Sequence, residues 1–215
     1  MTEKKLSAKQ IKRRADILQA ARELIVERGY QGVTMRELAD RSDVAFKTLY
    51  LLYDNKENLL TTAVEKGHRD YYDDRQSQDI GEGLDRLLAI VDALVGSMLI
   101  DDAYTKTMAP VLISGTNSSK FREVREEAYG SAVQQIAEKG DLVSWMDSAT
   151  VTRLILGMVI GSYVEWTNGE IATAELGDYL KLQIVLLLNG LTSGETHAEI
   201  QDHIKNLAPR VTSAT

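Results

Sequence analysis

Hydroxyl, cationic and aromatic side chains follow one another closely between residues 34 and 56 of the sequence. In proteins, ammonium and hydroxyl groups donate hydrogen bonds to phosphates and base edges, and apolar side chains contact the methyl group of thymine. Lys47 is suited to a guanine, Phe46 to a thymine methyl group, and Thr48 to a base or a phosphate. These residue types in one short stretch indicate a surface that reads double-stranded DNA.

Two short helices must position these side chains. The first is predicted from a capping box, Thr34-Met35-Arg36-Glu37, in which Thr34 is the N-cap and Glu37 reaches back to it. Ser42-Asp43 interrupts this helix, and the second is expected over about residues 45–51. Such a pair is typical of a helix-turn-helix, whose second helix fits the ~12 Å major groove. Many small helical hairpins share the layout, so spacing alone also allows a purely structural role.

The neighbouring helices are expected to support this pair. An apolar stripe at helical spacing runs from Ile17 to Ile25, on a helix that Gly29 is expected to end. Asp54-Asn55-Lys56-Glu57 predicts another N-cap, at Asp54, and a helix that continues to about residue 72. Backbone N–H groups at such helix starts favour phosphate oxygens, as does Lys56. Four residues of the short helices and their turn are expected to bury against Ile17, Ala21 and Leu24, namely Leu38, Ala39, Val44 and Leu49.

Charge is divided unevenly along the chain. The net charge of the 215 residues is −7, yet residues 1–60 carry twelve basic and nine acidic side chains, a balance of +3. The rest of the chain therefore balances at −10. Residues 1–14 alone hold six cations and one glutamate. A basic N-terminal arm on an acidic body is typical of polyanion binding, although a solvated tail has the same composition.

Several classes of protein are excluded or disfavoured by composition. Without cysteine there is no disulfide, thiolate nucleophile or Cys-ligated metal. The most apolar run, Ile184–Leu188, is far shorter than the ~20 residues of a membrane span, and no signal peptide is recognisable, so a cytoplasmic protein without a membrane partner is expected. His197 and His203 fall on different sides of a helix, and a His68–Asp70 pair is more typical of a solvated surface. No catalytic residue, metal or cofactor is predicted, which leaves a helical enzyme as the weaker alternative.

Longer and more apolar helices are expected in the rest of the chain. Pro110 predicts a kink or an end in one of them, and Pro209 a stop in the last. The predicted fold class is all-α, with a basic arm and three-helix DNA-binding domain over residues 1–60 and a larger helical domain over residues 61–215. The expected C-terminal helices cover residues 81–99, 103–113, 118–139, 147–168, 175–191 and 196–207.

Pairing of two copies is expected because a single head with a few phosphate contacts binds DNA weakly. Two glycines four residues apart let another helix approach closely, and an apolar stripe follows on the next predicted helix. The apolar residues on both of these predicted helices are also explained as the core of a single chain. The candidate interface consists of Leu154, Gly157, Gly161, Leu180, Ile184, Leu187, Leu188 and Leu191.

A ligand cavity is the second function expected of the C-terminal domain. Methionine and aromatic side chains with a few polar groups are suited to line an apolar pocket, although ordinary core packing explains any one of them. The candidate pocket residues are Tyr71, Met98, Tyr104, Met108, Asn117, Tyr129, Trp145, Met158, Tyr163 and Trp166.

Five short motifs between residues 13 and 60 occur in a specific order and spacing: I-L-x-A-A-x-x-L, R-G-Y, V-T-M-R-x-L-A, V-x-x-x-T-L-Y and K-E-x-L. They resemble the DNA-binding domain of the TetR family of bacterial transcriptional regulators. The resemblance covers less than a quarter of the chain. The turn departs from the usual Ala-Gly-Val, so Asp43 is expected to take a left-handed backbone conformation. Lys47 also replaces a frequent glycine, which leaves the operator sequence open.

The resemblance implies DNA contacts at Thr34, Lys47, Thr48, Tyr50 and Lys56, with Tyr50 and Lys56 on phosphates. It further implies a C-terminal domain that dimerises and takes a small hydrophobic or amphipathic effector. The resulting hypothesis is a dimeric repressor released from a palindromic operator, with a DNA-binding regulator that takes no ligand as an alternative. Together with the residues singled out by position, the predicted DNA contacts are Thr34, Arg36, Ala45, Phe46, Lys47, Thr48, Tyr50 and Lys56.

Overall fold

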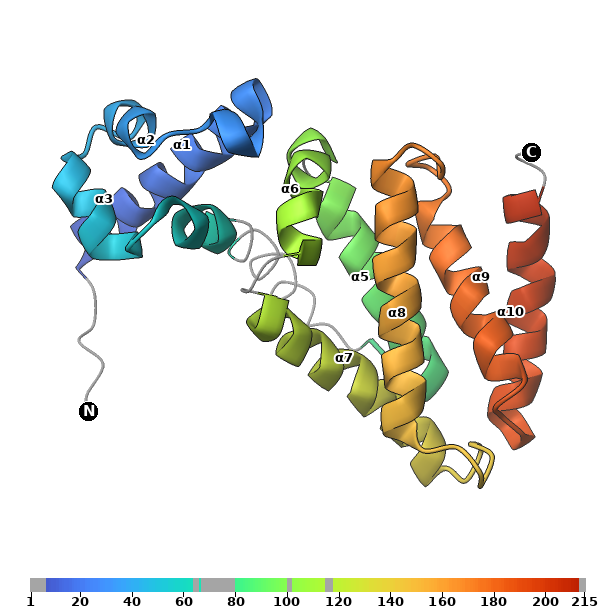
Figure 1. Ribbon diagram of the computed structural model, residues 1–215. Coiled ribbons are helices and arrows are strands. Elements are labelled where there is room, and N and C mark those ends of the chain that lie inside the picture. The colour runs from blue at the N-terminus through green and yellow to red at the C-terminus, as the bar shows by residue number, and fades with distance from the viewer. Residues whose placement is uncertain (1–6, 64–65, 67–79, 100–101, 115–117, 213–215) are drawn as a thin grey trace. The chain divides into compact units, whose positions relative to one another are not determined.

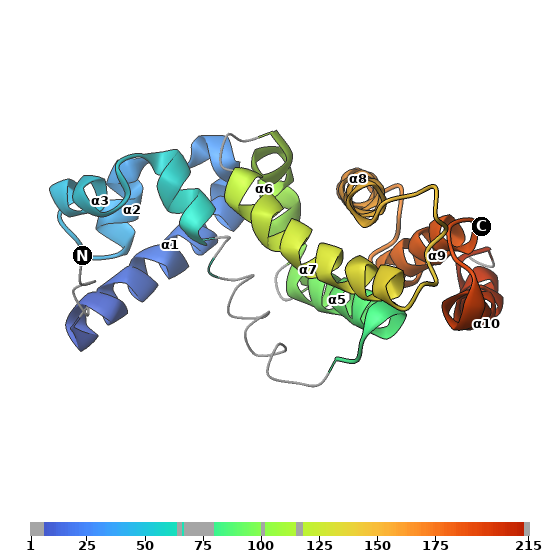
Figure 2. The same ribbon diagram turned by 90° about the horizontal axis from the view of Figure 1, so that it is seen from below.

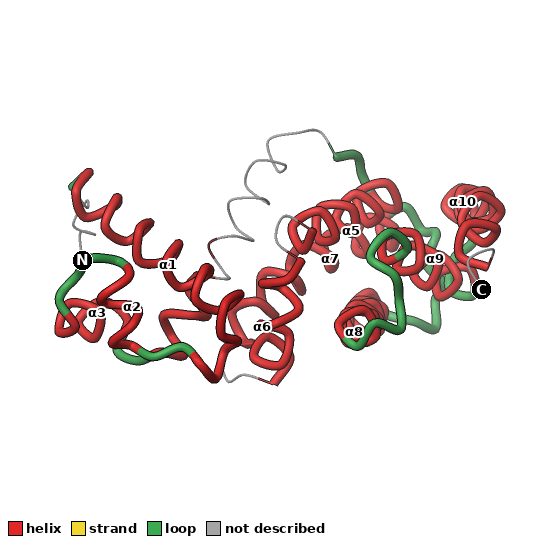
Figure 3. The backbone as a smooth tube through the Cα atoms, turned by 90° about the horizontal axis from the view of Figure 1, so that it is seen from above, coloured by secondary structure: helices red, strands yellow, loops and turns green. Residues whose placement is uncertain are grey.

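The computed structural model describes residues 7–63, 66, 80–99, 102–114 and 118–212. Within these ranges all regular elements are helices, apart from one isolated bridge between Leu142 and Thr192 (Figure 3). The predicted all-helical fold class, with an N-terminal helix-turn-helix and a larger helical part, is confirmed. None of the described helices combines the length and the hydropathy that crossing a bilayer requires.

The chain divides into two compact units, which we call the head and the body. The head consists of Met1–Arg69 and Asp101–Asn117, and the body of Asp70–Ile100 and Ser118–Thr215. The predicted division after residue 60 follows chain order, whereas the head also takes in α6, Asp102–Ser114. The head is therefore assembled from two separate stretches of sequence.

Three helices open the head: α1 (Ala8–Gly32), α2 (Met35–Arg41) and α3 (Phe46–Tyr53), followed by a helix over residues 56–63 (Figure 1). The apolar stripe of α1 is buried, as predicted, because α2 and α6 pack on this helix, while α3 packs on α2. Val44 in the turn is only half-buried. The predicted core residues that are almost wholly inaccessible to solvent are Ile17, Ala21, Leu24, Leu38, Ala39 and Leu49.

Local backbone chemistry sets the ends of these helices. Gly29 has a φ of 69° and interrupts the regular geometry of α1, at the residue where the sequence predicted the end. Asp43 has a φ of 51° in the turn between α2 and α3, which confirms the predicted left-handed conformation. The predicted cap at Asp54 is wrong, because Asp54 itself turns left-handed (φ 65°) and Asn55 accepts from the N–H of Asn58 at 2.8 Å. One residue of register therefore separates the predicted cap from the real one.

Arg22 joins α1 to two other parts of the head. Its Nη2 donates to the carbonyl oxygen of Ala63 at 2.9 Å, and its guanidinium lies 5.9 Å from the ring centre of Tyr104 on α6. Because α6 packs on α1, it completes the core behind the three N-terminal helices.

The described body contains α5 (Gly83–Leu99), α7 (Ser118–Glu138), α8 (Ser148–Thr167), α9 (Leu176–Asn189) and α10 (Gly194–Thr212). Helix α7 packs on α5 and α8, and α9 packs on α5, α8 and α10. Asp147 caps α8 by accepting from the N–H of Thr150 at 2.7 Å. The predicted stop at Pro209 is wrong, since α10 continues to Thr212. Of the kink or end predicted at Pro110, the end is wrong, because α6 continues to Ser114. A proline removes one backbone donor but leaves helical angles open to the residues after it.

Candidate nucleic-acid interface

Helix α3 has a buried side and an exposed side, and its exposed side carries three of the predicted DNA contacts. Leu49 is fully buried, and Tyr53 is nearly so. On the other side Phe46, Lys47 and Tyr50 are exposed, with the rings of Phe46 and Tyr50 in contact at 5.0 Å between centres. Positions one, two and five of an eight-residue helix share one side because they are three or four residues apart. The structure thus brings these three predicted contacts together.

The remaining predicted residues of α3 lie at its edges. Ala45 is exposed and stands at the N-cap, where its methyl side chain offers no acceptor to the first N–H groups of the helix. Thr48 is half-buried. Sequence reasoning missed Leu51, which is 85% exposed. Its spacing of four from Lys47 was the available signal, because it puts both on one side of the helix.

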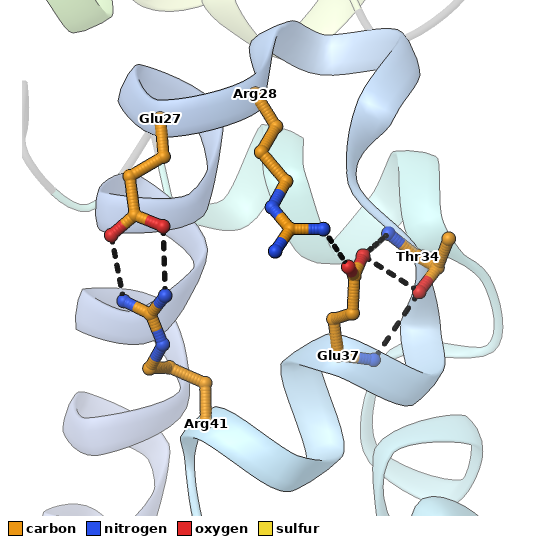
Figure 4. Close-up of polar contacts among 5 residues, drawn as sticks. All are labelled: Glu27, Arg28, Thr34, Glu37 and Arg41. Carbon is orange, nitrogen blue, oxygen red and sulfur yellow. Dashed lines mark hydrogen bonds and ion pairs between the residues drawn. The ribbon is translucent and has the colours of Figure 1, made fainter.

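Thr34 begins α2 through the predicted capping box (Figure 4). Its hydroxyl accepts from the N–H of Glu37 at 3.2 Å and donates to Glu37 Oε2 at 2.9 Å, while its own N–H reaches the same oxygen at 3.2 Å. The other carboxylate oxygen of Glu37 accepts from Arg28 of α1. The Thr34 hydroxyl is thus already engaged as a cap, and its contact with DNA stays a prediction, like that of exposed Arg36.

A second ion pair holds the other end of α2 on α1 (Figure 4). Arg41 donates in a fork to Glu27, with distances of 2.9 and 2.8 Å, and lies 3.5 Å from Glu23. The hydrogen bond from Arg41 lowers the pKa of Glu27, and those from Thr34 and Arg28 lower the pKa of Glu37, with Thr34 contributing most. We call these two carboxylates and their arginines the brace. Arg28 and Arg41 serve the positioning of α2 in this arrangement.

Acid is expected to loosen the brace. A carboxyl group whose pKa is lowered by folding stabilises the fold above its unfolded pKa, about 4.5 here, and that contribution is lost as the pH falls through the folded value. Titration from pH 6 to pH 3, followed by the NMR signals of α2, should therefore show its tertiary contacts weakening below pH 4.5. A variant with Glu27→Gln and Glu37→Gln should show a shallower dependence. Equal acid sensitivity in both proteins would mean that other groups control the transition.

Lys56 holds the start of the following helix against the end of α1. Its Nζ donates to the carbonyl oxygen of Tyr30 at 3.2 Å and lies 4.9 Å from the centre of the Tyr30 ring. Burial raises the pKa of the Tyr30 phenol. Because an ammonium group has three donors, this bond leaves capacity for a phosphate oxygen.

The predicted pocket residues are distributed over both units. Met98, Tyr129, Tyr163 and Trp166 are buried in the body, and Met158 is half-buried there. Tyr104 and Met108 are buried in the head, on α6.

The remaining pocket predictions fare differently. Trp145 was wrongly predicted to line a cavity, since it is 68% exposed in the turn between α7 and α8. Tyr71 and Asn117, like His68, lie outside the described residues.

The residues of the predicted dimer interface divide into exposed and buried ones. On α8, Leu154 is 44% exposed, and Gly157 and Gly161 are exposed with open space where a Cβ atom would stand. In and after α9 the prediction needs correcting, because four of the residues belong to the core of the body. These are Leu180, Ile184 and Leu188 on α9, and Leu191 just after its end.

The outward side of α9 carries different residues. Leu186 is 53% exposed, and Leu187, which was predicted, is half-buried next to it. The run Ile184–Leu188 is apolar on every side of the helix, so hydrophobicity alone gives no preference for one face. Only packing against α5, α8 and α10 selects the buried side.

Comparison with known proteins places this geometry in context. Residues 17–63 match the family model "Bacterial regulatory proteins, tetR family". The chain is 28% identical over 182 residues to the HTH-type transcriptional repressor KstR of Rhodococcus jostii, covering 83% of this chain and 84% of that protein. KstR of Mycobacterium tuberculosis is 27% identical, with 85% and 83% covered. Among solved structures, a putative TetR-family regulator from Syntrophomonas wolfei superposes with a TM-score of 0.69 at 18% identity, covering 83% and 95% of the two chains.

Proposed function

We propose that the chain is a transcriptional repressor of the TetR family that acts as a ligand-responsive dimer, because residues 17–63 match the model of that family and the chain is similar to KstR repressors over most of its length. In this proposal two heads bind the halves of a palindromic operator in the cytoplasm of a bacterium. A small hydrophobic or amphipathic effector releases them.

The observation that carries the proposal is the exposed side of α3. Phe46, Lys47 and Tyr50 supply an apolar ring, a cation and a phenol on one surface of a helix that is anchored from behind by Leu49. This combination suits base edges and phosphates of the major groove. The brace and the Lys56–Tyr30 contact keep α2 and the following helix in place around it.

Dimerisation is supported by the exposed stripe of α8. Leu154, Gly157 and Gly161 lie on one side of the helix, and Leu186 adds an exposed apolar side chain from α9. A second copy of the chain would cover this surface by packing the same two helices about a two-fold axis. Such a dimer presents two α3 helices, which must stand ~34–36 Å apart to reach successive major grooves.

Release by an effector would then be a population shift. A ligand that binds better to dimers with a different head spacing weakens operator binding, typically by ~1–3 kcal/mol of coupling. The buried aromatic side chains Tyr129, Tyr163 and Trp166 of the body are the groups that such a ligand would meet. A regulator without an effector is the second candidate, and it predicts that operator affinity is indifferent to every small amphipathic molecule tested.

Two lysines of the head provide the test of DNA recognition. Lys47→Ala should change the preference for one or two base pairs by roughly 10-fold to 100-fold, because an exposed ammonium at the front of α3 reads base edges. Lys56→Ala should weaken binding to all sequences alike and reduce the salt slope by about one, because the DNA group proposed for Lys56 is a phosphate. Fluorescence anisotropy on DNA from upstream of the protein's own gene, with single-base variants, measures both effects.

The control for this test is the unfolding midpoint of each variant, since Lys56 also holds the Tyr30 carbonyl. If both substitutions weaken binding uniformly, the division of roles between base and phosphate is wrong. If the unmodified protein shows no salt-sensitive, sequence-selective binding at all, the proposed function itself fails.

A further inference from the structure

Helix α8 lies at the edge of the body with one side uncovered. Figure 2 shows it nearly end-on, with α7 and α9 on its inner side and no other described helix of the body on its outer side. The outer side is largely apolar, because Leu154 and Ile160 are 44% and 39% exposed and the two glycines of the stripe, Gly157 and Gly161, open onto free space. Exposed apolar surface of this kind marks a site that another protein covers.

Two charged residues flank the outer side of α8. Arg153 and Glu165 are the only charged residues of this helix, and neither forms an ion pair with a described residue. Arg153 donates to the hydroxyl of Thr150 on its own helix, at 3.2 Å. Glu165 is half-buried, and its Oε2 atom is shielded from solvent without accepting a hydrogen bond from the described part of the chain. A carboxylate oxygen in that position costs free energy until a donor reaches it.

The positions of the two charges are related by a reversal of the helix. Arg153 stands six residues before Val159, and Glu165 stands six residues after it. The apolar and small residues of the outer side follow the same symmetry, in the pairs Leu154–Val164 and Gly157–Gly161. Read backwards through Val159, α8 therefore presents the same pattern with its two charges exchanged.

A second α8 that runs antiparallel across Val159 matches this pattern. Its Glu165 would stand level with Arg153 of the first copy, and its Arg153 level with Glu165. A parallel copy would instead bring like charges level with each other. At ~1.5 Å per residue the two charges of one helix are ~18 Å apart along its axis, so both ion pairs can form at once, one on either side of the glycines. The glycines allow the helix axes to approach to ~8 Å, a distance that arginine and glutamate side chains bridge together from the two flanks.

We propose that Arg153 and Glu165 form two reciprocal ion pairs across an antiparallel contact between two α8 helices, and that these pairs select a second copy of this chain as the partner. The inference rests on the proposed dimer, to which it adds a direction, a centre at Val159 and a basis for selectivity. A related helix with another charge at either position would be rejected, because like charges would then meet.

Charge reversal tests the ion pairs. Arg153→Glu and Glu165→Arg, made singly, each bring like charges level twice in a homodimer, so the dissociation constant of the dimer should rise at least about 100-fold. A double variant with both substitutions restores opposite charges and should dimerise within about tenfold of the unmodified chain. Sedimentation velocity measures these constants, and thermal unfolding checks that each variant is folded. The matched control is Lys139→Glu, which reverses an exposed cation of the body outside α8 and should leave the dimer unchanged.

Mixing the variants tests the selectivity. The two single variants, mixed in equal amounts, should form heterodimers almost exclusively, because opposite charges meet at both positions only between unlike chains. The unmodified chain mixed with the double variant should form homodimers only. Native mass spectrometry distinguishes the three kinds of dimer after the subunits have exchanged.

The outcomes separate this proposal from the dimer on which it rests. If the unmodified chain dimerises but the single variants do so equally well, the double variant recovers nothing, or the mixtures are random, then the ion pairs are wrong and the dimer stands. If the unmodified chain is a monomer at micromolar concentration, the proposed dimer fails and the ion pairs fail with it.

Discussion

Gly157→Gln is expected to produce a well-folded monomer that has lost nearly all its operator affinity. Gly157 is an exposed residue in the middle of α8, and a Cβ atom there meets nothing within 4 Å. Within one chain the substitution should stabilise α8 by about half a kcal/mol, because glutamine is the better helix former. In the proposed dimer the same side chain stands where the partner helix must approach. A head that binds alone loses the gain from a linked second site, which is of order 10²–10⁴ in affinity.

Sedimentation velocity measures the oligomeric state, and fluorescence anisotropy measures the affinity for operator DNA. Thermal unfolding at low protein concentration measures the stability of the single chain. Ala149→Gln is the matched control, since it places the same side chain at another exposed position, in the first turn of α8. It should remain dimeric. If the Gly157→Gln protein is dimeric and binds operator DNA with full affinity, the dimer interface does not include the exposed stripe of α8.

The second large effect is expected from two leucines that stand two residues apart on α3. Leu49 is fully buried, and removing its side chain should cost about 2–5 kcal/mol, a large part of the stability of a small domain. Leu49→Ala should therefore unfold the head near physiological temperature and abolish DNA binding. Leu51→Ala makes the identical chemical change at a position that is 85% exposed, so stability should change by less than about 0.5 kcal/mol.

Urea unfolding and anisotropy on operator DNA compare the two variants directly. Leu51→Ala should keep its affinity within about tenfold, because Lys47 and Tyr50 stay in place beside it. Equal destabilisation by both substitutions would mean that α3 presents a different side to the solvent.

The head was the part of the fold most open to prediction, because its signals are local. Thr34 and Glu37 are three residues apart, so the local helix geometry is enough to bring them together in a capping box. The left-handed conformation of Asp43 follows likewise from a turn between two short helices. Local signals failed where two good caps adjoin, at Asp54 and Asn55, since backbone angles decide between them, and at Pro110, past which α6 continues.

Longer-range features were beyond sequence reasoning. Arg41 meets Glu27 across 14 positions, and one sequence offers many such pairs of opposite charge. The buried side of α9 depends on three neighbouring helices, because a helix with leucine in every direction has no intrinsic inward face. For the same reason Trp145 was assigned to a cavity, although it lies on an exposed turn.

The discontinuous head has a consequence for building hybrid regulators. Joining residues 1–60 to the sensor domain of another protein would leave behind α6, on which α1 packs, and the Tyr104 ring under the Arg22 guanidinium. The module to transplant is instead the whole head, which consists of two separate segments of the chain, Met1–Arg69 and Asp101–Asn117. Interchangeable DNA specificity in this scaffold is therefore best sought by exchanging the surface residues of α3, with both segments retained.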